Sequence, residues 1–547
     1  MRKRNGFNYR QTVTTPVKQS KIKYSPYANN LGYDEVIREK QEEYAIWYGG
    51  ESDAILQYYI EARPMHHGSN YEEFWNRKDY FWAVVGREDD VKCTHSGLPK
   101  AIIDTLVNIL GKPEIGVSKE ETVINAETNE KTLEVVEDIA TTARLQKIIE
   151  DNNFYNIHGQ EQCTYTMVIG DGAYFVNIDE DLSEYPIIEY IDGRNIEFER
   201  KANRIIAITA RKYYSYNDKN YMLTDRRSTK WAEDAKTGKR KRIATVEYNL
   251  YELSNVGSDE VSKAVELDTI PDTTGLENLE YPDINVMLAV PCLYRYNKNT
   301  ERGDSFFTGK LDLFDDLDQS KSQSSNTNRL STPVDYIPEG LMEYTSEGKP
   351  IPPKRYDRRF VTMPADLNAV GQNLNQIHTS QPQLNFEQYT KEQLQLIGDI
   401  LVGLMSPATL GIDVSLKDNA DAQREKEKIT LVTRDNLVDM QTQILKRLFN
   451  LVLKIHDYMT NPKGKPGDYE ITVNYPEYAN PTFENKLAYL APVYVSGGMS
   501  AKRYVNDLWG DALSDEEKEE EVRILEQAKN AMQQMQDFNS GQDDMLF

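Results

Sequence analysis

The chain has little cysteine and no long apolar run, and these absences exclude several classes of protein. Its 547 residues hold only Cys93, Cys163 and Cys292, which lie far apart and lack CxxC spacing. This pattern predicts neither a disulfide framework nor a cysteine-based zinc site; we expect reduced thiols, although one pair could meet in space. No run of about 18 apolar residues occurs, and the start MRKRNGFNYR leads into QTVTTPVKQS without an apolar centre. We therefore expect neither a membrane-spanning segment nor a signal peptide of that kind.

Sequence motifs for catalysis are missing as well. The chain has no GxxxxGK[ST] phosphate-binding loop, no HExxH metal motif and no GxSxG nucleophile motif, and its six histidines show no paired ligand spacing. Gly170-Asp171-Gly172 is too short for a dinucleotide-binding fingerprint, and we interpret it as a tight turn between strands. These absences predict a protein without a catalytic centre, a metal ion or a cofactor.

Composition predicts a folded protein with a large excess of acidic residues. The hydrophobic content of 39% is sufficient for real cores, and the length suits roughly three to four domains. The net charge of −24 argues against tight wrapping of nucleic acid, because neutralising phosphates requires clustered Lys and Arg. An acidic surface is nevertheless compatible with DNA that slides past it, since like charges repel.

The charge is distributed unevenly along the chain. Residues 1–33 contain seven basic residues and no Asp or Glu, which predicts a basic, flexible arm. The run Lys236–Arg242, KTGKRKR, lies between probable strand sequences at Lys219–Leu223 and Ile243–Leu253, and we favour a hairpin tip over a nucleic-acid site. The acidic stretch Val256–Asp283 is predicted to be a surface loop.

One long amphipathic helix is the clearest element in the sequence. Apolar residues from Ile429 to Ile455 recur at spacings of three to five, with charged residues mostly between them. Asp418 or Asn419 can cap its start and Asn461-Pro462 can end it, so it covers about 40 residues. A helix of this length is unusual in a compact enzyme; the alternative is a core helix of a large domain.

Two shorter helices are predicted upstream. In Leu311–Ser331, the residues Leu311, Phe314 and Leu317 share one side, while Asp312, Asp315, Asp316 and Asp318 occupy other faces. The second helix, Phe386–Met405, contains Gly398 and Gly403, for which close packing is the expected reason. The loop that follows, Ala408–Asp421, is predicted to be exposed; its length is typical of functional loops, and a disordered segment would show the same pattern.

A proline-rich insert, Thr332–Pro382, separates these two helices. Val334–Ile337 and Arg359–Met363 are predicted to be edge strands within it. The insert also holds a local basic cluster, which comprises Lys349, Lys354, Arg355, Arg358 and Arg359. This cluster could meet an acidic partner or nucleic acid, and a solvated basic turn is an equal alternative.

In this order, the segments resemble the portal proteins of tailed bacteriophages, which form head-to-tail connector rings. Leu311–Ser331 resembles the first stem helix, Thr332–Pro382 the clip, Phe386–Met405 the second stem helix and Ser406–Asn419 the tunnel loop. YTMVIGDGAYFVNIDED at Tyr165–Asp181, followed by Glu184–Glu199, resembles the wing segment in which a glycine-containing turn joins two strands. Asn480–Val495, the glycines before Ser500 and the Glu-rich Leu513–Asn530 resemble the helical end of such chains. The likeness spans most of residues 165–530.

The resemblance implies an α+β, portal-like, multi-domain subunit. Its parts are a β-rich wing, a two-helix stem, a small α/β clip, a long helix after the tunnel loop and a helical C-terminal crown. The implied divisions are a basic arm at 1–33, the wing at 34–305, the first stem helix at 306–331, the clip at 332–382, the second stem helix at 383–405, the tunnel loop at 406–419, the long helix with a return strand at 420–480, the crown at 481–530 and a flexible tail at 531–547.

The function implied by the resemblance is structural. About 12 identical subunits would form a ring at one capsid vertex, through which double-stranded DNA is packaged and ejected. The expected partners are the terminase large subunit, the major capsid and scaffolding proteins, and later the neck and tail proteins, with no membrane; the protein would be part of the virion after assembly in the host cytoplasm. We hypothesise that Lys417 makes a weak contact with DNA, that the channel residues are Asp413, Asp418, Asp312, Asp315 and Asp316, and that the basic cluster of the insert docks partners.

Two alternatives stay open at the level of sequence. A metal-dependent nuclease could use Asp312, Asp315, Asp316 and Asp318, because Asp312 and Asp316 are one helical turn apart. A scaffolding protein without a channel is the other alternative. The acidic segment Ser514–Gln527, with a capping box of Ser514 and Glu517, suits either a crown or a scaffold.

Overall fold

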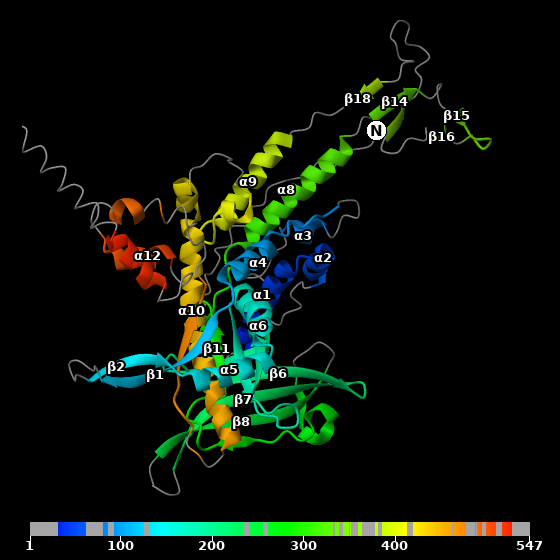
Figure 1. Cartoon of the computed structure of the whole chain (residues 1–547). Helices are drawn as coiled ribbons and strands as arrows, with labels where there is room; N and C mark the ends of the chain where they lie inside the picture. Colours follow the sequence, from blue (N-terminus) through cyan, green and yellow to red (C-terminus); the bar gives the residue numbers. More distant parts are fainter. Residues whose placement is uncertain are drawn as a thin grey trace, which may run out of the picture. The chain divides into compact units, whose positions relative to one another are not determined.

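The computed structural model divides the chain into two compact units, Met1–Tyr475 and Pro476–Phe547 (Figure 1). It describes residues 31–61, 80–85, 92–124, 131–233, 240–254, 261–298, 300–331, 334–338, 343–348, 350–351, 359–363, 378–380, 386–412, 420–461, 464, 466–476, 487, 490–494, 499–509 and 517–527. Helices and mainly antiparallel sheets both occur, so the α+β class is confirmed.

Short helices open the first unit. They are α1 (Leu31–Gly49), α2 (Ser52–Glu61), α3 (Phe81–Val85) and α4 (Leu98–Leu110), with α5 (Ile139–Asp151) following a hairpin. Helix α4 begins after Gly97, which has a φ of 69°, and carries Pro99 in its first turn, where a missing N–H is tolerated. Its apolar residues, among them Ile102 and Leu106, are buried.

Two of the three-stranded sheets in the described part of this unit join strands that lie far apart in the sequence. One has the order β19-β1-β2 and consists of β1 (Glu114–Ile124), β2 (Lys131–Glu137) and β19 (Glu470–Asn474). The other has the order β11-β3-β4 and consists of β3 (Asp171–Asn177), β4 (Ile187–Asp192) and β11 (Ala289–Leu293). Strand β19 confirms the strand expected at Glu470–Asn474, and it brings the end of the unit back onto β1. A two-stranded pair, β12 (Tyr296–Asn297) and β13 (Arg302–Gly303), follows β11.

A six-stranded antiparallel sheet forms most of the remaining β structure. Its order is β10-β8-β7-β6-β5, with β9 also on β8, and its strands are β5 (Ile196–Lys201), β6 (Arg204–Tyr216), β7 (Lys219–Glu233), β8 (Arg240–Leu253), β9 (Val261–Val265) and β10 (Leu279–Tyr281). The two-residue loop between β6 and β7 has positive φ at Asn217 and Asp218, which suits the twist of a hairpin. The strands β7 and β8 pair along their length, so the expected hairpin around KTGKRKR is confirmed, although residues 234–239 lie outside the described part.

The segment around Gly170 differs from the expected pair of strands. Residues before this glycine form α6 (Phe154–Asn156), a π-helical turn (Ile157–Cys163) and α7 (Thr164–Ile169). Gly170 ends α7 with a φ of 103°, and β3 begins at Asp171. The turn therefore joins a helix to a strand, and the strand-turn-strand interpretation of Tyr165–Asp181 was wrong. A short buried apolar run does not distinguish the two elements by periodicity, and a left-handed glycine suits a helix end equally well.

The acidic stretch predicted as a loop is partly ordered into regular elements. Its described part contains β9, β10 and two 3-10 turns, Leu267–Thr269 and Pro271–Thr273. Between these turns, Ile270 is buried and packs with Tyr221 and Leu250 of the six-stranded sheet. Ile270, with the partly buried Leu267 and Leu276, thus holds against the sheet a stretch whose charged side chains remain in solvent.

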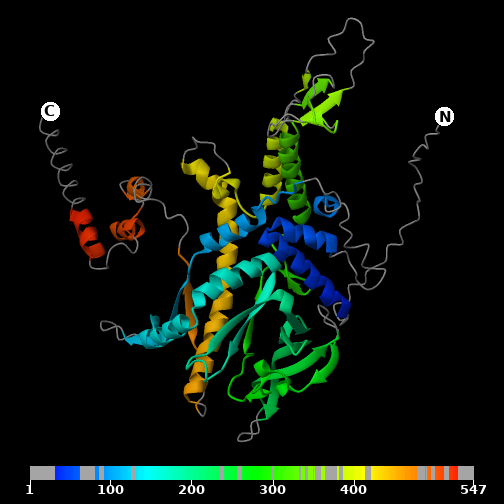
Figure 2. The same ribbon diagram turned by 90° about the vertical axis from the view of Figure 1, so that its right-hand side faces the viewer.

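Two helices and a strand-containing insert follow the sheets. Helix α8 (Leu311–Leu330) and helix α9 (Phe386–Leu401) lie side by side in both views (Figures 1 and 2). The insert contains β14 (Val334–Pro338), β15 (Glu343–Tyr344), β16 (Pro350–Ile351), β17 (Arg359–Met363) and β18 (His378–Ser380). Strand β14 pairs with β17 in parallel and with β18 antiparallel, so it is a central strand. The expectation that it lies at an edge was wrong, because its prolines stand at the ends of the strand and interrupt no inner pair.

The long helix is confirmed as α10 (Ala420–Thr460), which contains 41 residues. A 3-10 turn, Pro407–Leu410, precedes it, and its proposed caps Asp418 and Asn419 lie outside the described residues. Its second half is buried in an apolar core that includes Leu448, Phe449 and Val452. In the second unit, α12 (Ala501–Trp509) packs Tyr504 and Leu508 against Leu490, and residues 517–527 are helical.

Candidate functional site

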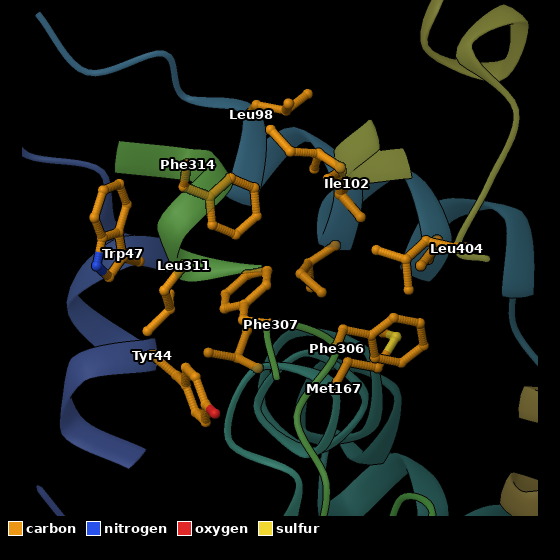
Figure 3. Close-up of a cluster of buried hydrophobic side chains, with 14 of the residues drawn as sticks. Tyr44, Trp47, Leu98, Ile102, Met167, Phe306, Phe307, Leu311, Phe314 and Leu404 are labelled. Carbon is orange, nitrogen blue, oxygen red and sulfur yellow. The ribbon is translucent and has the colours of Figure 1, made fainter. Parts of the chain in front are cut away.

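The candidate site consists of α8, α9 and the first half of α10, which we call the stem helices. Figure 3 shows Leu311 and Phe314 of α8 directed toward Trp47 of α1 and toward Phe307. The rings of Trp47 and Phe314 stack with centroids 5.9 Å apart, and Phe307 meets Phe314 edge to face at 5.4 Å. Leu317 is also buried in this core. The apolar side predicted for α8 therefore fixes the helix to the first unit.

Two of the four clustered aspartates face the same core. Asp315 accepts hydrogen bonds from the backbone N–H groups of Phe81 and Trp82, at 2.7 and 3.4 Å. Asp318 accepts from the Trp82 indole N–H at 3.1 Å and from the Ser96 backbone N–H at 2.7 Å. Its carboxylate also lies 2.6 Å from His95 Nδ1. These carboxylates anchor α8 to α3 and to the residues before α4.

The pKa of Asp315 is raised to about 7, mainly by burial, with smaller upward contributions from the neighbouring Asp318 and Asp316. The backbone hydrogen bonds from Phe81 and Trp82 act in the opposite direction but are weaker than the loss of hydration. With only 4% of its surface exposed, Asp315 has no access to a channel. Its proposed place in a channel wall is therefore corrected: it is an internal anchor of α8.

Asp312 and Asp316 lie on the exposed side of α8. Asp312 accepts a hydrogen bond from the Tyr80 hydroxyl group. Partial burial raises the pKa of Asp316, with smaller contributions from Asp312 and from Glu392 of α9, so the three carboxylates are electrostatic neighbours. Glu392 also accepts a hydrogen bond from Ser320 at 3.2 Å. We call Asp312, Asp316 and Glu392 the acidic side of the stem helices.

This division of the aspartates bears on the nuclease alternative. Two-metal chemistry requires carboxylates that converge on one point. Asp315 and Asp318 instead bind N–H groups inside the fold, whereas Asp312 and Asp316 face outward. Within the described ranges, no group of three or more His, Cys, Asp or Glu side chains could hold a metal ion.

Helices α9 and α10 expose large apolar side chains. Leu394 lies in α9 and is 51% exposed, and Val402 lies just after α9 and is 67% exposed. Phe386, the first residue of α9, is also largely exposed. Near the start of α10, Ile429 and Val432 are 50% and 55% exposed. Apolar side chains grouped on consecutive elements are typical of a surface that another protein covers.

The glycines of α9 have no packing role inside this chain. A Cβ atom added at Gly398 would meet no atom of the described residues within 4 Å. The close packing expected at this glycine is therefore not found among the described residues. Gly403 has a φ of 76° and lies just beyond the end of α9, which stops at Leu401 and not at the predicted Met405. Its role is conformational, because L-residues rarely adopt this geometry.

The other predicted site residues lie mainly outside the described part of the chain. These residues are Asp413, Lys417 and Asp418 of the loop before α10, and Lys349, Lys354, Arg355 and Arg358 of the insert. Arg359 begins β17. Their proposed contacts with DNA and with docking partners stay predictions.

A buried polar centre beside the sheets was missed by the sequence reasoning. Asp171, at the start of β3, accepts hydrogen bonds from Arg302 Nε at 2.6 Å and from its Nη2 at 2.9 Å. Gln41 of α1 donates to the same carboxylate at 2.9 Å. Arg302 further donates to the Gly193 carbonyl at 2.6 Å and to that of Ile196 at 3.0 Å. The available signal was an acidic residue between two glycines, at the start of an otherwise apolar strand.

Comparison of the chain with protein-family models finds no match, and comparison with curated proteins finds none either. In the helices that the structure describes, no segment has both the length and the apolar character needed to cross a membrane.

Proposed function

We propose that this protein is a portal subunit of a tailed bacteriophage, which closes with identical copies into a ring at one capsid vertex. The observation that carries the proposal is the order of elements at the stem helices. An antiparallel pair, α8 and α9, flanks a strand-containing insert, and the 3-10 turn Pro407–Leu410 lies between α9 and the 41-residue α10. The hydrogen bonds Ser320–Glu392 and Thr327–Tyr389 join the pair along its length.

Exposed apolar residues on α9 and α10 support the ring. Leu394, Val402, Ile429 and Val432 leave a surface that one copy of the chain does not cover. A head-to-tail contact between neighbours would bury it, and such a contact repeats until the ring closes. The packing partner that Gly398 lacks within its own chain would then be a neighbouring helix.

The acidic side gives the proposed channel its relation to DNA. Asp312, Asp316 and Glu392 would repel phosphate, so the duplex slides without being gripped. Glu392 takes the place of Asp315 in the proposed channel set, and Asp413 and Asp418 stay in it as predictions. We retain Lys417 as one weak contact per subunit; its replacement by Glu should impair packaging and retention of DNA, and unchanged packaging would remove it from the proposal.

The remaining partners follow from the same proposal. The insert between α8 and α9 would present its basic cluster to the terminase large subunit during packaging and to neck and tail proteins afterwards. Major capsid and scaffolding proteins would surround the ring in the virion. The role is one of assembly and passage, and no covalent step is assigned to the chain.

Electron microscopy of the purified full-length protein tests this function. We expect closed rings with a central hole, and we expect Leu394→Ser with Val432→Ser to reduce the fraction of rings strongly. Leu182→Ser is the matched control, because Leu182 is an exposed leucine outside the stem helices. Small oligomers without a hole would instead favour a scaffolding protein.

A further inference from the structure

The outer end of the β7–β8 hairpin carries an exposed tryptophan among basic residues. Trp231 of β7 is 69% exposed and pairs in register with Arg242 of β8, while Glu233 pairs with Arg240. Residues 230–242 contain six basic residues and two acidic ones, namely Lys230, Lys236, Lys239, Arg240, Lys241 and Arg242 against Glu233 and Asp234. We call Trp231, Arg240 and Arg242 the hairpin end.

The ion pairs of this region leave the hairpin end with positive charge. Lys230 pairs with Glu280, and Lys241 pairs with Asp283 at 3.3 Å. Arg242 donates from Nε to the Thr229 hydroxyl group at 2.7 Å, a neutral partner. Within the described residues, neither Arg240 nor Arg242 forms an ion pair, and both side chains are exposed. A large exposed aromatic ring beside such arginines has the composition of an interface hot spot.

The opposite end of the same sheet is acidic. Residues 266–277 contain four acidic residues, Glu266, Asp268, Asp272 and Glu277, and no basic one. All four are exposed, and none forms an ion pair within the described residues; we call these four the acidic end. The acidic end is held to the sheet by Ile270, which packs on Tyr221. The neighbouring base Lys219 is already paired with Glu252 at 2.7 Å.

The two ends lie far apart on one body. Tyr221 and Trp231 belong to the same strand, and ten residues of strand span roughly 33 Å. Two complementary surfaces at opposite ends of one body cannot meet within a single copy. They can meet between copies, in a head-to-tail contact that repeats identically around a closed ring.

We propose that the hairpin end of one copy docks on the acidic end of the next copy, as a contact between neighbouring subunits at their six-stranded sheets. This inference rests on the proposed ring and names the surfaces that join it away from the stem helices. Arg240 and Arg242 face the four carboxylates. Trp231 covers Pro271 and Leu276, which remain accessible at the acidic end. Because the pairing is ionic in part, assembly weakens as salt rises.

A charge-swap experiment on the full-length protein tests the contact. One variant carries Arg240→Glu and Arg242→Glu, so both of its ends are negative. A second carries Glu266→Lys, Asp268→Lys and Asp272→Lys, which leave three Lys against Glu277, so its acidic end becomes positive like its hairpin end. The matched control carries Lys201→Glu and Arg204→Glu, which reverse two exposed bases at the β5–β6 turn. Circular dichroism and thermal unfolding verify that all variants fold.

The measured quantity is the protein concentration at half-assembly, determined by mass photometry and sedimentation. Each swapped variant alone should require at least about 30-fold more protein than wild type, as expected for an interface hot spot. An equal mixture of the two variants should assemble nearly as wild type does, because each negative hairpin end then meets a positive partner. Trp231→Ala should weaken assembly in the same direction. The control variant should assemble normally.

Several results would overturn the inference. If each swapped variant alone forms the wild-type ring, the proposed contact is absent while the proposed function stands. If wild type itself stays monomeric at every concentration, the ring and the contact fall together. If the hairpin variant assembles normally but loses binding to a DNA duplex, the hairpin end serves nucleic acid and not a second copy.

Discussion

The polar centre around Asp171 and the stem helices differ in how far their side chains find partners within one copy of the chain. At Asp171, each buried charge has its partner within the chain, and glycines allow backbones to touch: a Cβ atom on Gly303 would lie 1.9 Å from the Gly170 carbonyl oxygen. On the stem helices, apolar side chains such as Leu394 face solvent, and Gly398 has open space around it. In the first region the buried charges are paired within one copy, whereas under the proposed function the second gains its partners when copies assemble.

The largest loss of stability is expected when the polar centre around Asp171 is disrupted. Arg302→Ala leaves Asp171 buried without its counter-charge, which should lower the free energy of unfolding by about 3–5 kcal/mol. Arg226→Ala is the matched control, because Arg226 also binds two carboxylates, Glu199 and Glu247, but near the surface. It should cost less than about 1 kcal/mol. Urea unfolding of both variants measures the difference, and equal losses would contradict the distinction.

A pH-dependent effect is expected at the anchored side of α8. The pKa of Asp315 is raised in the folded state, so its contribution to stability is complete below the unfolded pKa near 4 and is lost as pH rises toward about 7. The unfolding free energy of wild type minus that of Asp315→Asn should therefore fall by up to about 4 kcal/mol across this window.

Thermal and urea unfolding at several pH values measure that difference. Asp439→Asn, at an exposed position of α10, serves as the control and should give a difference that does not vary with pH in this window. A difference independent of pH in the Asp315→Asn variant would show that this carboxylate is not held in its neutral form.

A smaller loss of stability is expected when a methyl group is added at Gly303, beside the polar centre. Gly303→Ala directs a Cβ atom at the backbone of Gly170, which cannot move aside as a flexible side chain would. Overpacking of this kind costs about 1–3 kcal/mol. The midpoint of urea unfolding measures the loss, and a stability equal to that of wild type would mean that the two backbones can separate freely.

The smallest expected effect on stability is a gain, at Gly398 of α9. Gly398→Ala adds a methyl group to open space within α9 and should stabilise the isolated chain by about 0.5–1 kcal/mol. In the assembled form, the same methyl group would meet a neighbouring copy and reduce ring formation. Stabilisation without any loss of assembly would show that no neighbour packs at this position.

Local patterns in the sequence were sufficient to predict α8 and α10 but not their surroundings. The period of apolar residues located α8 and α10 closely. The sequence also indicates the side of α8 on which two aspartates lie. Asp315 follows Leu311 by four residues and Asp318 follows Phe314 by four, so both lie next to the apolar side. Their partners, Phe81, Trp82 and Ser96, lie more than 200 residues away in the chain, so no local pattern indicates them.

The polar centre around Asp171 could not be predicted from local sequence patterns for the same reason. Asp171 and Arg302 are separated by 131 residues, and only the fold brings them together. Gly170 illustrates a second limit, because a glycine at positive φ ends a helix as readily as it turns a hairpin. The loop before α10 and the basic cluster of the insert remain sequence predictions.

Native mass spectrometry of the full-length wild-type protein tests the central claim most directly. The proposed ring predicts one dominant species of about twelve copies, with few smaller species at micromolar concentration. A stable monomer or dimer across the whole concentration range would contradict the proposal, because a head-to-tail contact that ends at one or two copies leaves exposed residues of α9 and α10 uncovered.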